Sequence, residues 1–294
     1  MQQQPSGGGE EASEGAEYED ALRQTGIIVG LSAAFGAAVW ALKGPDSGLE
    51  WFAGYLLEES LSVDNLFVFI LLFKNFNLSD RSLQKRVLNY GVIGAMVMRA
   101  LFILVGVAAI ESFKPVLLVF AGILVFSSAK MLVGKEKEDE SLEDNKVVQF
   151  ATKLMNSTDQ YDGDKFWTIV DGVKRATPLL LLLVCIELSD LVFAVDSIPA
   201  VFGVTKDPLI VFTSNVAAIL GLRSLYTVVN KAMSEIVYLE KSVAVVLGFV
   251  GAKMIADYGG MEISTAASLG IIASILGGGV GLSFISPPTP SSDE

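Results

Sequence analysis

One apolar stretch constrains this chain more than any other, because it is long enough to cross a bilayer and yet contains three acids. Residues 181–199 read LLLVCIELSDLVFAVDSIP, with Glu187, Asp190 and Asp196 and no basic residue among them. An ionised Asp at the centre of a membrane helix costs about 2.5–3.5 kcal/mol even on lenient insertion scales. We therefore expect these side chains to face a protein interior, a water-filled cavity or a cation, and not lipid.

A second stretch repeats this pattern. Residues 55–73 read YLLEESLSVDNLFVFILLF and contain Glu58, Glu59 and Asp64. The chain as a whole is 52% hydrophobic, and its long uncharged runs predict a polytopic helical membrane protein. The net charge of -12 gives no reason to expect a nucleic-acid partner. The chain has no histidine, and no pairing of a nucleophile with a base stands out, so we do not expect an enzyme.

The apolar runs predict an all-α fold with about eight transmembrane helices. These runs are residues 27–42, 51–73, 87–110, 115–133, 179–202, 208–229, 242–256 and 265–284. The charge pattern divides the chain into a disordered acidic N-terminal tail (1–22), a membrane region (23–133), a charged loop (134–177), a second membrane region (178–285) and a C-terminal tail (286–294).

Lys and Arg are unevenly distributed between the two sides of the membrane. They are concentrated in the N-terminal flank and in the loops that follow the second, fourth and sixth runs. Because loops on the cytoplasmic side carry an excess of positive charge, both termini are predicted to face the cytoplasm or its organellar equivalent, the stroma.

Residues 51–133 and 179–257 form an internal repeat. Four positions are shared in the same order, namely Glu58 and Asp190, Asp64 and Asp196, Asn65 and Ser197, and Arg99 and Arg223. Each copy contains three predicted spans, and an odd number of spans inserts the two copies with opposite orientation. Two inverted three-helix repeats are the layout of many secondary transporters, with the binding site near the midplane between them.

The polar residues of the repeats are hard oxygen ligands, which suit Mn²⁺, Mg²⁺ or Ca²⁺ better than soft metals. The candidate metal ligands are Glu58, Asp64, Asn65, Glu187, Asp190, Asp196 and Ser197. Arg99 and Arg223 are candidate counter-charges. A rival interpretation is that the two arginines neutralise the acids and hold the bundle together, and the two interpretations can coexist. We expect no tightly bound cofactor, and a transported cation that is Mn²⁺ in the first place, with Ca²⁺ or Mg²⁺ as alternatives.

Three motifs resemble the TerC family of integral membrane proteins. They are ESLSVDNLFVF (59–69), IELSDLVFAVDSIPAVFGVT (186–205) and SNVAAILGLRSLY (214–226), and the resemblance covers about residues 50 to 285. The sequence YDGDKF (161–166) is similar in particular to the plastid thylakoid and cyanobacterial branch.

This resemblance implies two functions. Bacterial members of the family are linked to manganese export, which implies a divalent-cation transporter in the lipid bilayer. Plant members reside in the thylakoid membrane and are linked to its biogenesis, which implies a factor whose loop 134–177 meets the thylakoid insertion machinery. The implied location is the chloroplast thylakoid membrane with the termini in the stroma, or alternatively a cyanobacterial or bacterial inner membrane.

Overall fold

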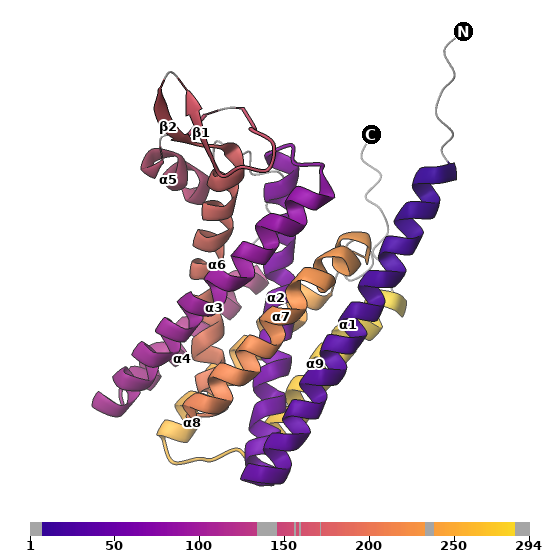
Figure 1. Cartoon of the computed structure of the whole chain (residues 1–294). Helices are drawn as coiled ribbons and strands as arrows, with labels where there is room; N and C mark the ends of the chain where they lie inside the picture. Colours follow the sequence, from indigo (N-terminus) through magenta and orange to yellow (C-terminus); the bar gives the residue numbers. More distant parts are fainter. Residues whose placement is uncertain are drawn as a thin grey trace.

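Helices make up most of the chain in the computed structural model (Figure 1), which describes residues 8–133, 146–155, 157–158, 160–170, 172–232 and 238–285. The elements are α1 (Gly8–Lys43), α2 (Pro45–Asn75), α3 (Arg81–Ser112), α4 (Val116–Val133), α5 (Lys146–Leu154), β1 (Trp167–Val170), β2 (Val173–Ala176), α6 (Pro178–Phe202), α7 (Pro208–Ala232), α8 (Leu239–Tyr258) and α9 (Thr265–Ile285). The first part of the predicted loop (134–145) and the predicted C-terminal tail (286–294) lie outside the described residues.

Five of the described helices are long and apolar enough to cross a membrane. They are Tyr18–Lys43 within α1, then α3, α4, α6 and α9. This confirms an all-α polytopic membrane protein, whereas the number eight stays a prediction. The central helix α2 is one residue shorter than α3, but its acids make it too polar to be recognised as a span from composition alone.

The acidic N-terminal tail predicted to be disordered is helical from Gly8 onward, so that prediction was wrong for residues 8–22. Ala and Glu, which are frequent in this segment, are strong helix formers. Acids near a helix N-terminus are also favoured by the helix dipole. The segment therefore extends the first predicted span toward the N-terminus and does not form a separate tail.

Local sequence explains where several helices begin. Gly44 has a φ of 99°, a left-handed conformation that glycine adopts without strain, and Pro45 follows it at the first helical position of α2. Asp80 caps α3, because its side chain accepts a hydrogen bond from the Ser82 N–H at 2.8 Å. Pro178 occupies the first position of α6, directly after Thr177.

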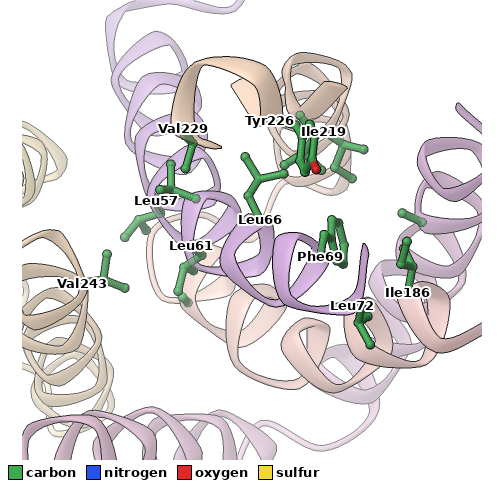
Figure 2. Close-up of a cluster of buried hydrophobic side chains, with 14 of the residues drawn as sticks. Leu57, Leu61, Leu66, Phe69, Leu72, Ile186, Ile219, Tyr226, Val229 and Val243 are labelled. Atoms are coloured by element: carbon green, nitrogen blue, oxygen red, sulfur yellow. The ribbon is translucent and has the colours of Figure 1, made fainter. Parts of the chain in front are cut away.

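The core lies around α2, which contacts α1, α6, α7 and α9. Figure 2 shows apolar side chains of α2 packed among those of α6, α7 and α8, and the labelled residues are Leu57, Leu61, Leu66, Phe69, Leu72, Ile186, Ile219, Tyr226, Val229 and Val243. A polar side chain on this face of α2 is therefore removed from both water and lipid. The most extensive of the other packing contacts join α4 to α8, α1 to α7, and α3 to α6 and α7.

The second part of the predicted loop 134–177 is folded. β1 and β2 form an antiparallel hairpin in which Trp167 pairs with Ala176 and Ile169 with Lys174. The hairpin lies at the end of the bundle where α6 begins (Figure 1). The Tyr161 hydroxyl donates to the Phe76 carbonyl at the end of α2, at 2.8 Å.

The start of α3 is joined to the same segment. Arg86 forms an ion pair with Asp164 and lies over the ring of Phe166, whose edge meets Tyr90 at a centroid distance of 5.2 Å. Within the segment, hydrogen bonds from Thr168 and Lys165 hold the pKa of Asp162 below its ordinary value.

Candidate functional site

Arg99 of α3 joins four helices through its guanidinium group. Its Nη2 donates to Asp190 Oδ1 at 2.8 Å and its Nε donates to Oδ2 at 3.2 Å, which is a two-pronged contact with α6. Its Nη1 forms an ion pair with Glu58 of α2. The same nitrogen lies 3.5 Å from Ser197 Oγ of α6 and 3.5 Å from Asn215 Oδ1 of α7. We call these five residues the Arg99 cluster.

The Arg99 cluster is almost completely removed from solvent. Glu58 is 0% exposed, Arg99 1% and Asp190 3%. Two carboxylates and one guanidinium give the cluster a formal charge of −1 when all three groups are ionised. Buried charges are costly unless they are paired and hydrogen-bonded. Arg99 can compensate for one carboxylate, so one negative charge is left without a matching positive charge in the described part of the cluster.

Several polar atoms around the cluster have no hydrogen-bond partner among the described residues. They are both carboxylate oxygens of Glu58, Ser62 Oγ, Asn65 Nδ2 and Asn215 Nδ2. The ion pair between Glu58 and Arg99 brings opposite charges together without hydrogen-bond geometry. Buried polar atoms in folded proteins nearly always have a partner. This set therefore indicates a site that a further polar species, such as a cation or water, would complete.

Helical spacing accounts for the arrangement. Glu58, Ser62 and Asn65 are at positions i, i+4 and i+7 of α2 and share one stripe, and all three are buried. Asp190 and Ser197 are likewise seven residues apart on α6, and both contact Arg99.

Glu187 lies one turn before Asp190 on α6 and packs against α3. A Cβ atom built on Gly94 would overlap the Glu187 carboxylate, so the absence of a side chain at Gly94 makes room for it. Glu187 and Asp190 both line a small pocket between α2, α3, α6 and α7. Glu187 thus lies beside the Arg99 cluster but is not part of it.

Asp196 faces a different neighbour. Its Oδ1 accepts a hydrogen bond from Ser127 of α4 at 2.8 Å, because six residues of an α-helix turn its side chain about 120° away from Asp190. The structure therefore brings Glu58, Asp190 and Ser197 together with Arg99 and places Asp196 apart. The side chains of Asp64 and Arg223 lie outside the described part of the structure.

Sequence reasoning missed two residues of these contacts. Asn215 was not among the candidate ligands, and the available signal was the polar Thr-Ser-Asn triplet of α7 to which it belongs. Ser127 gave no signal, since a single serine in an apolar helix is common. Among the described residues, no group of three or more His, Cys, Asp or Glu lies close enough to hold a metal ion. A cation at the Arg99 cluster would therefore need amide, hydroxyl or water ligands beside Glu58 and Asp190.

A family model and individual related proteins point to the same family. The model of the integral membrane protein TerC family matches residues 43–288. The thylakoid membrane protein TERC of Arabidopsis thaliana is 49% identical over 286 residues, which are 97% of this chain and 74% of that protein. The uncharacterised membrane protein STKORF319 of Myxococcus xanthus is 42% identical, over 94% of this chain and 86% of its own length.

A bacterial relative carries a different name. A protein of Escherichia coli (strain K12) named as the membrane-bound redox modulator Alx is 41% identical, over 85% of this chain and 79% of its own length. No solved structure matches the chain.

Proposed function

We propose, from the premise that this chain belongs to the integral membrane protein TerC family, that it binds a divalent cation at the Arg99 cluster and carries it across the bilayer. One observation supports this above all others. Two buried carboxylates share a single guanidinium group, and polar atoms around them lack partners among the described residues. A site of this composition is incomplete without a further positive charge.

Arg99 explains how such a site can exist when it is empty. Two unpaired carboxylates in the membrane interior would be costly, and Arg99 reduces that cost until a cation arrives. The incoming cation and the guanidinium then compete for the same oxygens. Binding therefore loosens the contact between α3 and α6, and this links cation binding to a movement of helices.

Mn²⁺ is the cation that we propose first. The available ligands are carboxylate, amide and hydroxyl oxygens, which suit hard cations, and Ca²⁺ and Mg²⁺ are the alternatives. Asp64, Glu187 and Asp196 would bind the ion before or after it occupies the cluster. Arg223 would serve as the counter-charge in the second repeat.

The helix packing supports transport between two inverted repeats. In the sequence repeat α2 corresponds to α6, α3 to α7 and α4 to α8, and the members of each pair contact one another. This is the pattern that a two-fold axis in the membrane plane would produce. Rocking of one repeat against the other would expose the Arg99 cluster to one side at a time.

The deciding experiment is Mn²⁺ uptake into proteoliposomes that contain the purified protein. Asp190→Asn should abolish uptake while the protein remains inserted and folded, because the variant loses one of the two charges of the site. Asp46→Asn is the matched control, since Asp46 is exposed in the first turn of α2. Normal uptake by Asp190→Asn would refute this assignment of the site.

A second candidate function is assistance in assembling photosynthetic membrane proteins. The observation that favours it is the hairpin, on which Trp167 is 48% exposed and Ile169 is 74% exposed, together with a relative named as a thylakoid membrane protein. On this proposal the hairpin meets the thylakoid insertion machinery, and the termini lie on the same, stromal side. In a bacterial or cyanobacterial setting, the same side would be the cytoplasm.

A change in the hairpin distinguishes the two candidate functions, cation transport and assistance in assembly. Replacing Trp167 and Ile169 by Ser should abolish the rescue of thylakoid assembly in a deficient plant if the hairpin binds a partner. The same variant should keep its Mn²⁺ uptake in proteoliposomes, because neither residue contacts the Arg99 cluster. Full rescue by this variant would count against the assembly role.

A further inference from the structure

The pocket beside Asp190 lies in one half of the bundle, the half nearest the hairpin. Its walls include Phe69 of α2, Leu88 and Val92 of α3, Glu187 and Asp190 of α6, and Leu222 of α7. Phe69 is close to the end of α2, whereas Leu88 is close to the start of α3. Since α2 ends and α3 begins near the hairpin (Figure 1), these wall residues place the pocket on the hairpin side of the Arg99 cluster.

Among the described residues, Glu187 and Asp190 are the only acids that line this pocket, and no basic side chain lines it. Glu187 is half-buried and forms no ion pair with a described residue. The remaining wall positions that are named above are apolar. A pocket with apolar walls and two acids favours cations over anions, because low-dielectric walls strengthen the field of the acids.

The position of Glu187 depends on a glycine of the facing helix. The carboxylate occupies the space where a side chain at Gly94 would begin. Gly91, one turn earlier on α3, also lines the pocket. The missing side chains at these two positions keep α3 from filling the space beside α6.

We propose that this pocket is the vestibule through which the cation reaches the Arg99 cluster, and that Glu187 is the first carboxylate to bind it there. Asp190 follows three residues later on the same face of α6, a rise of about 4.5 Å. A cation bound at Glu187 is therefore within one helical turn of Asp190. This inference rests on the proposed transport function and adds its route of access and the side from which it is reached.

Thiol labelling tests the route independently of transport. Cys185 is the single cysteine of the chain and is buried, so Cys185→Ala gives a background without thiols. In that background, Val92→Cys should react with a membrane-impermeant thiol reagent added from the hairpin side. Lys174→Cys on β2 and Lys206→Cys after α6 are the controls for the two sides, since both side chains are exposed at opposite ends of α6.

The outcome of labelling is decisive in each case. Reaction of Val92→Cys from the hairpin side, slowed by Mn²⁺, would support the vestibule. Reaction from the opposite side, or no reaction while both controls react, would overturn it. Reaction that Mn²⁺ does not slow would overturn the assignment of the pocket to cations. If Mn²⁺ protects the thiol and the wild type transports nothing, the transport proposal fails and the vestibule stands.

Kinetics then test the role of Glu187. Glu187→Gln should raise the half-saturating Mn²⁺ concentration several-fold and leave the maximal rate close to that of the wild type, because Asp190 and Arg99 remain. Gly94→Ala should have the same effect, since its methyl group displaces the carboxylate. Gly122→Ala is the control, because a Cβ atom there meets nothing within 4 Å. An unchanged half-saturating concentration in both Glu187→Gln and Gly94→Ala would overturn the assignment of Glu187.

Discussion

Arg99 is placed where two carboxylates compete for one guanidinium group, and Asp190 has the better geometry. Asp190 receives two hydrogen bonds, whereas Glu58 receives an ion pair without a hydrogen bond. A lysine could not reproduce this arrangement, because its ammonium group lacks the planar fork that holds one carboxylate at two points. One guanidinium group thus serves two buried carboxylates.

Removing the guanidinium group should therefore make the fold dependent on a metal ion. Arg99→Gln leaves Glu58 and Asp190 buried without a cation, and breaking a buried ion pair in this way costs about 3–5 kcal/mol. We expect a lower thermal unfolding temperature in detergent and a larger rise on adding Mn²⁺ than in the wild type. Lys114→Gln is the control, since Lys114 is exposed after the end of α3. Equal responses of Arg99→Gln and the wild type to Mn²⁺ would contradict the prediction.

The sequence predicted part of this site for a clear physical reason. An acid inside a membrane costs so much free energy that it must have a partner, and this need can be inferred from the sequence. The seven-residue spacing on α2 and on α6 placed Glu58 with Asn65, and Asp190 with Ser197, on one face of each helix. The sequence did not predict which acids contact Arg99 and which contact a different helix. The six-residue spacing in α6 turns Asp196 away from Asp190, but that Asp196 meets Ser127 depends on which helix packs on that side of α6.

At the scale of elements, the second part of the predicted loop 134–177 is held against the helix bundle by specific polar contacts. Its docking depends on polar contacts to the ends of α2 and α3, chiefly the Tyr161 hydroxyl on Phe76 and the ion pair of Arg86 with Asp164. Asp162 organises the turn before β1 by accepting bonds from Thr168 at 2.8 Å and from Lys165 at 3.1 Å. The sequence indicated a charged loop, but such contacts between distant residues have no periodic pattern to reveal them.

The Asp162 contacts should make the hairpin sensitive to acid. The pKa of Asp162 is lowered from 3.8 in the folded chain, so its ionised form stabilises the hairpin above that value. This stabilisation is lost as the pH falls through the lowered pKa. Trp167 fluorescence, in a variant with Trp40→Phe and Trp51→Phe, should therefore change below pH 3.8. Asp162→Asn should remove this transition, and an unchanged transition in that variant would assign it to another group.

At the scale of the whole molecule, the described start of α1 and the described end of α9 both lie toward the end of the bundle that bears the hairpin (Figure 1). This arrangement requires an even number of crossings, as the predicted eight would give. The number eight was predicted from apolar runs and loop charges, and it stays a prediction. The packing of α4 on α8 and of α2 on α7 was not predicted, because contacts between distant helices depend on shapes that a hydropathy pattern does not record.

Epitope tags test this topology directly. Tags placed before Gly8 and after Ile285 should both be digested by a protease added from the side that labels Lys174→Cys, and both should be protected from the side that labels Lys206→Cys. The positive-inside pattern assigns the first side to the cytoplasm or stroma. Digestion of the two tags from opposite sides would contradict an even number of crossings.

The docking of the hairpin also fixes an order of events while the chain is being made. The segment 161–166 that leads into it contacts Phe76, Arg86 and Tyr90, which come earlier in the chain, and α6 begins two residues after β2 ends. The hairpin therefore precedes Asp190 along the chain, and it can meet a surface formed by α2 and α3 before the segment that carries Asp190 enters the membrane. Helix α6 can then enter the membrane beside Arg99. The Asp190 carboxylate would pair with the guanidinium group there and would not face lipid.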